Sequence, residues 1–159
     1  MHGGVAVLTT LPLATRLGDG LPLGREPVAT VPLFNLWSLQ WTAQRLPHAL
    51  SGWWDAPIFW PSRGTYAGSE LQPLTGAVYA LLHLVAGPAT AYGLLVLVAL
   101  ALDGLVVAAL ARRLGASEAP AALAGILAQT APFLVEQFGV LQLVSTWSIA
   151  LVLERVLAW

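Results

Sequence analysis

Residues 89–111 read ATAYGLLVLVALALDGLVVAALA, and this stretch decides the fold class. It contains a single charged residue, Asp103, in a run that is otherwise almost entirely apolar. A helix needs roughly 20 mostly apolar residues to cross the hydrocarbon core of a bilayer, because each residue adds only about 1.5 Å to its length. The stretch therefore predicts a membrane-spanning helix.

The composition extends this prediction to the whole chain. Of its 159 residues, 57% are hydrophobic and 9% are charged, with seven Arg, no Lys and eight acidic residues. A soluble domain carries about 25% charged residues, so this composition excludes a soluble globule, a disordered segment and a basic nucleic-acid binder. The absence of cysteine excludes disulfides, a thiol nucleophile and a zinc–thiolate site.

Three further segments have the apolar character of spanning helices. Residues 119–135 and 141–157 are short for this purpose, and crossing requires tilt or local thinning of the bilayer. Residues 5–17 lack the basic region and cleavage site of a signal peptide, and they predict the outer part of a first spanning helix. The predicted fold is an all-α, polytopic transmembrane bundle in a single membrane domain over 1–159.

Residues 18–88 differ in kind and predict a long first outer loop. Tryptophan favours the membrane–water boundary, and this loop contains five of the seven tryptophans: Trp37, Trp41, Trp53, Trp54 and Trp60. Within 32–46 a polar row repeats at helical spacing opposite Leu and Trp, which predicts an amphipathic helix in the interface plane. Its polar residues are Asn35, Ser38, Thr42 and Arg45.

The orientation depends on residues 73–86, which are too short to cross comfortably and predict a second interfacial helix. The adjacent pair Arg112 and Arg113 is typical of a cytoplasmic connection. If 73–86 does not cross, the Trp-rich loop is outside the cytoplasm; if it crosses, the arginine pair faces outward instead. We predict the first arrangement, in the inner membrane of a bacterium.

Three stretches together resemble a known family. They are PLFNLWSLQW (32–41), WWDAPIFWPSRGTYAGSELQP (53–73) and FGVLQLVSTWSIAL (138–151), and the linking piece ALARRLGASEAPAALAGILAQTAPF (109–133) has the same character. The chain is similar to the N-terminal part of bacterial polytopic proteins of the GT-C glycosyltransferase superfamily. More distantly, it resembles lipid A aminoarabinose transferases and protein O-mannosyltransferases. The segment 55–73 is the most specific element.

The resemblance implies transfer of a sugar from a polyprenyl-phosphate donor to an extracytoplasmic acceptor, with the lipid bilayer as the other partner. Family members carry an acidic motif after the first helix, where this chain has only Asp19 and Glu26. They also have more helices, so we expect a fragment of a longer protein. The alternative is a non-catalytic polytopic membrane protein, either a degenerate relative or a transporter-like component, and the sequence leaves enzymatic activity open.

Two loop carboxylates are the predicted catalytic residues. Asp55 suits a general base that removes the acceptor proton, or a metal ligand; its other interpretation is a turn or helix cap. Glu70 either shares a divalent metal or the acid–base roles with Asp55, or caps the following helix. Arg63 lies between them in sequence and either binds the donor phosphate, since guanidinium recognises phosphate through a planar fork, or is a surface arginine that contacts lipid headgroups or one of these two acids.

Other polar residues occur in or beside the predicted spans. The charge of Asp103 is costly inside a membrane, so we expect a structural role for this residue, either neutral or paired with Gln129 or with a group outside the chain. His83 has no partner at metal-ligand spacing, and we interpret it as a packed histidine. Three residues at an outer helix end are predicted to line the cavity or merely to solvate that end: Glu136, Gln137 and Gln142.

Overall fold

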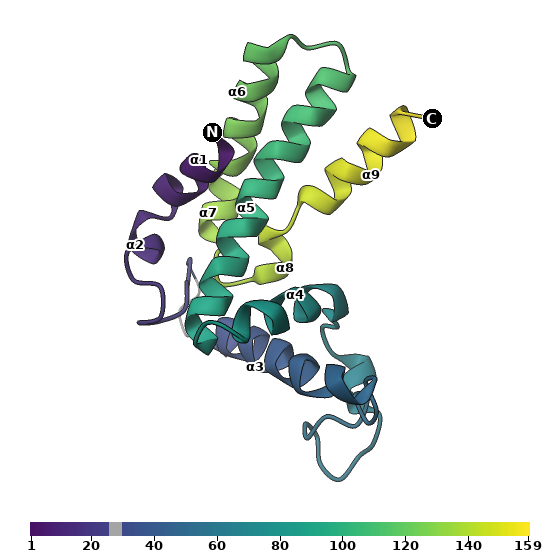
Figure 1. The fold of residues 1–159 in the computed structure, drawn as a ribbon. Coiled ribbons are helices and arrows are strands. Elements are labelled where there is room, and N and C mark those ends of the chain that lie inside the picture. The colour runs from purple at the N-terminus through teal and green to yellow at the C-terminus, as the bar shows by residue number, and fades with distance from the viewer. Residues whose placement is uncertain (26–29) are drawn as a thin grey trace.

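The computed structural model describes residues 1–25 and 30–159, and Figure 1 shows its course. Within these residues the chain is helical and forms no strand, which confirms the predicted all-α class. An isolated bridge joins Leu17 and Gly20. The α-helices are α1 (His2–Thr9), α2 (Leu11–Ala14), α3 (Thr30–Arg45), α4 (Pro73–His83), α5 (Pro88–Arg113), α6 (Glu118–Gln129), α7 (Pro132–Glu136), α8 (Leu141–Val144) and α9 (Trp147–Leu157), and two 3₁₀ turns are η1 (Leu46–His48) and η2 (Thr65–Gly68).

Helix α5 is the central element and corresponds to the predicted span over 89–111. Pro88 occupies a first-turn position, where its missing amide hydrogen costs nothing. The helix ends before Gly115, whose positive φ of 96° lets the chain reverse. Helices α1, α4, α6, α8 and α9 all pack against α5 (Figure 1).

Two segments are long and apolar enough to cross a membrane. One is α5, and the other is Glu118–Glu136, which contains α6 and α7 and corresponds to the predicted span over 119–135. These two segments weakly suggest that the protein associates with a membrane. In the described ranges, no third helix has this length and hydropathy, so a bundle of more spans stays a prediction.

The predicted helix over 5–17 is interrupted in the structure. Helix α1 ends at Thr9, and the short α2 follows after Thr10. Pro12 has no amide hydrogen to donate to the carbonyl of Leu8, so the helical ladder cannot continue there. The hydroxyl of Thr10 also donates to the carbonyl of Ala6 at 2.7 Å. Neither piece alone has the length of a membrane span.

The predicted helix over 141–157 is divided as well, into α8 and α9. The Ser145 hydroxyl donates to the Leu141 carbonyl at 3.1 Å, and the Thr146 hydroxyl donates to Asp103 on α5. Such side-chain bonds compete with the helical ladder and favour a break. Helix α9 therefore runs in a different direction from α8 while it packs against α5 (Figure 1).

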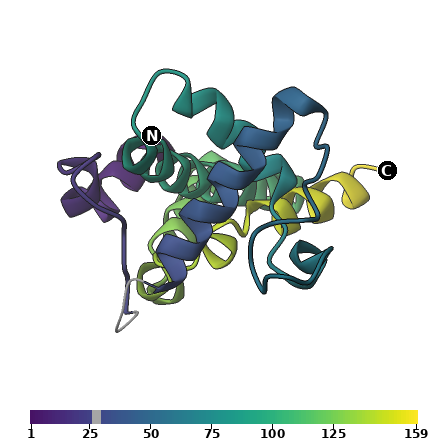
Figure 2. The ribbon, with the colours of Figure 1, turned by 90° about the horizontal axis from the view of Figure 1, so that it is seen from below.

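Helices α3 and α4 pack on each other at the N-terminal end of α5, and Figure 2 shows α3 lying across that end. Their ranges match the predicted interfacial helices over 32–46 and 73–86 closely, but the orientation of α3 corrects the prediction. Its polar residues Asn35, Ser38 and Thr42 are buried, whereas Leu33 is exposed. The polar row faces the protein because buried partners satisfy its hydrogen bonds.

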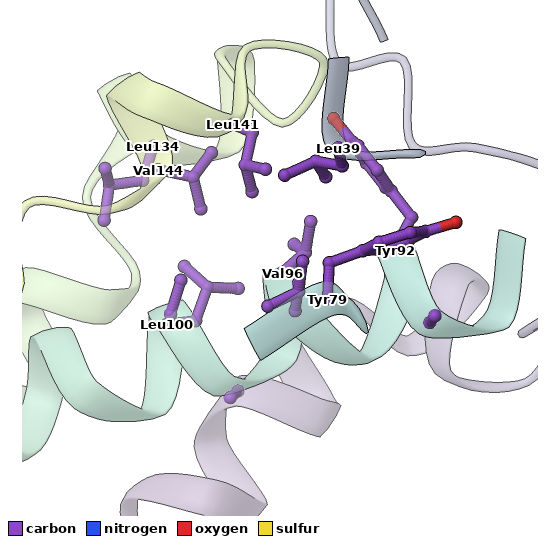
Figure 3. Packing of buried hydrophobic residues seen from close by; sticks show 12 residues of the cluster. Leu39, Tyr79, Tyr92, Val96, Leu100, Leu134, Leu141 and Val144 are labelled. Carbon is purple, nitrogen blue, oxygen red and sulfur yellow. The ribbon is translucent and has the colours of Figure 1, made fainter. Parts of the chain in front are cut away.

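The main core lies where α5 meets α3, α4, α7 and α8. Figure 3 shows Leu134, Leu141 and Val144 pointing towards Val96 and Leu100 of α5. The other side chains labelled there are Leu39, Tyr79 and Tyr92. Outside this core, many large apolar side chains on the helices remain exposed, as expected where lipid replaces water around a helix.

Helices α5 and α6 approach each other closely at two glycines. A Cβ atom on Gly125 would overlap the backbone carbonyl oxygen of Gly104, and one on Gly104 would overlap the side chain of Gln129. Small residues at a crossing permit this distance between helices in membranes. The buried Gln129 amide then donates to the carbonyls of Leu100 at 2.7 Å and His2 at 3.0 Å, which ties α1, α5 and α6 together.

Candidate functional site

The predicted catalytic loop is built on an aromatic cluster against α3. Trp53 and Tyr66 are buried and contact each other edge to face, and the Trp53 indole donates to the Thr42 hydroxyl at 3.1 Å. The Trp41 indole donates to the Trp53 carbonyl at 2.9 Å, and the hydroxyls of Tyr66 and Ser38 share a short hydrogen bond. The polar row of α3 thus serves as the attachment surface for this loop.

Asp55 closes the loop that follows. Its Oδ1 accepts a hydrogen bond from the backbone amide of Gly64 at 2.8 Å, and Gly64 has a positive φ of 67°. The side chain is therefore used as a turn-closing acceptor, as one of the two sequence interpretations expects. Asp55 is exposed, and among the described residues no donor contacts its Oδ2. One oxygen remains available for a ligand or a proton.

The other two predicted loop residues form no contact with the Asp55 carboxylate within the described residues. Arg63 is exposed and, within the described ranges, forms no ion pair with either carboxylate. Glu70 instead accepts a short hydrogen bond from the Gln142 amide, which joins the loop to α8. In the part of the chain that the structure describes, no three His, Cys, Asp or Glu side chains come together as metal ligands.

The three residues predicted to line one cavity do not line a common cavity in the structure. Glu136 forms an ion pair with Arg25 at 3.1 Å, and both side chains are substantially exposed. Gln142 is paired with Glu70 and borders a small cavity of about 290 Å³ that Gln72 and Ser145 also line. Gln137 lines neither this cavity nor the larger one described next.

A larger cavity of about 580 Å³ lies between α1, α2, α7 and the segment that follows α2. Its charged lining residues are Arg16 and Asp19, both exposed. Asp19 is one of the two acids noted after the first helix, and the other, Glu26, lies outside the described residues. Arg16 was not predicted from the sequence. A local signal was present, because Arg16 and Asp19 lie on either side of Gly18 directly after α2.

Asp103 has the structural role that its position predicts, but with a different partner. It is fully buried, and its Oδ1 accepts from the Thr146 hydroxyl at 2.8 Å at the start of α9. Gln129, the partner considered from the sequence, is engaged with α1 and with the backbone of α5. The Asp103 carboxylate thus holds Thr146, the residue directly before α9. An acidic group at this position complements the positive N-terminal end of the helix.

One further polar contact joins α3 to the residue before α4, and His83 makes only local contacts at the end of α4. The Gln72 amide donates to Asn35 Oδ1 at 3.0 Å, in the polar row. His83 is exposed rather than packed, with Nδ1 3.1 Å from the Ala86 carbonyl oxygen and its ring stacked on Tyr79. Burial raises the pKa of the Tyr79 hydroxyl above its ordinary value.

Comparison with protein-family models, with curated proteins and with solved structures found no match to this chain. The resemblance to GT-C glycosyltransferases therefore stays a prediction, and it rests on the sequence segments quoted above.

Proposed function

We propose that this chain is the membrane-embedded N-terminal part of a GT-C-like glycosyltransferase, which transfers a sugar from a polyprenyl-phosphate donor to an acceptor outside the cytoplasm. The observation that carries the proposal is the loop closed by Asp55 and Gly64. It presents a carboxylate oxygen that no donor of the described residues contacts and, next to Gly64, the cation Arg63, which forms no ion pair within the same residues. Both features of the proposed chemistry, a base and a phosphate ligand, lie in one short segment.

The proposed reaction is a direct displacement at the anomeric carbon of the sugar. The acceptor oxygen forms a bond to this carbon, and the bond from the carbon to the phosphate oxygen breaks. Polyprenyl phosphate leaves with the electron pair of that bond, while Asp55 takes the proton of the acceptor hydroxyl. Arg63 stabilises the charge on the departing phosphate. A divalent metal would need ligands beyond the described residues, such as Glu26, substrate oxygens or the rest of the protein.

Arg63 provides a test that needs no knowledge of the sugar. We expect Arg63→Gln to weaken binding of polyprenyl phosphate by about tenfold, the equivalent of about 1.4 kcal/mol, because a charge-assisted hydrogen bond is lost. Titration of the purified protein in detergent with polyprenyl phosphate, followed by native mass spectrometry, measures this effect. The matched control is Arg113→Gln, because Arg113 is the last residue of α5 and the loop that contains Arg63 lies at the other end of that helix. Equal affinity in all three proteins would remove Arg63 from the proposed site.

The proposed topology places Arg63 outside the cytoplasm and Arg112 in the cytoplasm. Since the chain has no cysteine, single cysteines at Ser62 and Ala116 report the two sides cleanly. On intact bacterial cells, a membrane-impermeant thiol reagent is expected to label position 62 and to label position 116 only after lysis. The reverse pattern contradicts the proposed orientation.

The alternative function is a non-catalytic membrane protein. One observation favours it: both predicted carboxylates are already bound within the chain, Asp55 to Gly64 and Glu70 to Gln142. Under this alternative the two acids only hold the loop, and their charge has no chemical use. Replacement of Asp55 by asparagine distinguishes the two functions.

A further inference from the structure

The loop closed by Asp55 presents two large aromatic side chains at its tip. Phe59 is 79% exposed and Trp60 is 86% exposed, whereas Trp53 and Tyr66 in the same loop are buried. Exposing a pair of large aromatic residues to water is unfavourable, because their apolar area gains most from burial. The loop thus separates aromatic residues that hold it to α3 from aromatic residues that point away.

This exposure is fixed by the backbone of the loop. Besides the bond between Asp55 and Gly64, the Thr65 hydroxyl donates to the carbonyl of Ile58 at 2.9 Å, and the Tyr66 amide donates to the carbonyl of Trp54 at 3.1 Å. Phe59 has a positive φ of 57°, a conformation that residues with a side chain rarely adopt. These bonds hold the backbone of the loop in the conformation that presents both aromatic residues at its tip.

The chemistry of the tip fits the headgroup region of a lipid bilayer. Tryptophan and phenylalanine favour this region, where rings are shielded from water and the indole N–H still meets polar groups. Arg63 provides a charge complementary to headgroup phosphate. The loop also lies at the end of α5 where that candidate span begins, together with α3 and α4 (Figure 1).

We propose that Phe59 and Trp60 insert into the headgroup region of the membrane in which α5 lies. This inference rests on the membrane association within the proposed function and deepens it. Insertion brings Arg63 to the depth of the lipid phosphates, which is where a lipid-linked donor presents its own phosphate. The loop thereby acts as an anchor that sets the height of the proposed site above the membrane.

The depth of the tip can be measured with a nitroxide on a single cysteine. Three variants of the otherwise cysteine-free protein are reconstituted in phosphatidylcholine vesicles: Phe59→Cys at the tip, Val98→Cys on the exposed side of α5, and Ala116→Cys in the turn before α6. Oxygen concentrates in lipid and a water-soluble nickel complex stays in water, so the accessibility of each label to both relaxants reports its depth. We expect position 59 to favour oxygen over nickel relative to position 116.

A second change tests whether the aromatic residue causes the insertion. Adding Trp60→Ser to the Phe59→Cys variant is expected to shift the label towards the nickel accessibility of position 116. Leu74→Ser is the matched control, since Leu74 is also a highly exposed apolar residue but lies on α4, outside the loop. It should leave the label at position 59 unchanged.

Each outcome bears on the proposal. A label at position 59 that resembles the one at position 116 places the tip in water and overturns the anchor. Low accessibility to both relaxants shows contact with protein, such as a second copy, and also overturns it. If Val98→Cys itself reports water, the membrane span fails; if only position 59 does, the anchor fails and the span stands.

Discussion

Replacement of Asp55 by asparagine is expected to lower the rate of sugar transfer by about 10²–10⁴-fold, the usual contribution of a general base. Asparagine keeps a carbonyl oxygen that can accept the bond from Gly64, so the loop should stay closed. Only the proton acceptor is lost. The measurement is release of polyprenyl phosphate from a lipid-linked sugar by the protein in its membrane.

The matched variant is Asp55→Ala, which removes both the proton acceptor and the bond to Gly64. If Asp55 is the base, the two variants should be similarly impaired in transfer. If Asp55 only closes the loop, asparagine should behave within a few-fold of the natural residue while alanine is impaired. That second pattern would reject Asp55 as the base and leave the acid–base role to Glu70 or Glu26.

Substitution of Gly125 by alanine is expected to destabilise the packing of α6 on α5 by about 1–3 kcal/mol, the usual cost of overpacking. The added methyl group would overlap the backbone of Gly104, which cannot move aside as a flexible side chain can. The helices must separate, and the hydrogen bonds of Gln129 to Leu100 and His2 lengthen with them. Thermal unfolding in detergent, followed by loss of the monodisperse protein, measures the change.

The control is Gly4→Ala in α1, another glycine inside a helix. No atom lies within 4 Å of a Cβ placed there, so the added methyl group meets open space. Alanine favours the helix over glycine by up to about 1 kcal/mol, and the melting temperature should stay equal or rise. Equal melting temperatures for the Gly125 variant and the natural protein would contradict the close crossing of α5 and α6.

The most accurate prediction from the sequence is the one that depends on a long continuous run of apolar residues. The apolar stretch over 89–111 fixed α5 to within a few residues, and the cost of a buried charge was enough to assign Asp103 a structural contact. It could not identify Thr146 as the partner, because the two residues are 43 positions apart and no local pattern connects them. The pairing of Glu70 with Gln142 was unpredictable for the same reason.

The orientation of α3 shows a second limit of prediction from the sequence. Periodicity located Asn35, Ser38 and Thr42 on one face, but it cannot tell whether a polar face meets water or buried polar partners. In α3 the apolar Leu33 and the polar Gln44 are exposed, whereas the apolar Leu39 is buried like the polar row. The break before α9 was also missed, since Ser145 and Thr146 interrupt the helix without a proline or a glycine.

The contact between Asp103 and Thr146 also has a consequence for biosynthesis. The ribosome adds Asp103 long before Thr146, so α5 is complete while its carboxylate still lacks this partner. An unpaired acid at the centre of a membrane helix costs about 2.5–3.5 kcal/mol on insertion scales. If α5 spans the membrane as we propose, newly made α5 enters the bilayer with this unfavourable free energy, and the hydrogen bond from Thr146 offsets part of it when the start of α9 emerges and docks. Insertion of α5 is then coupled to the synthesis of α9.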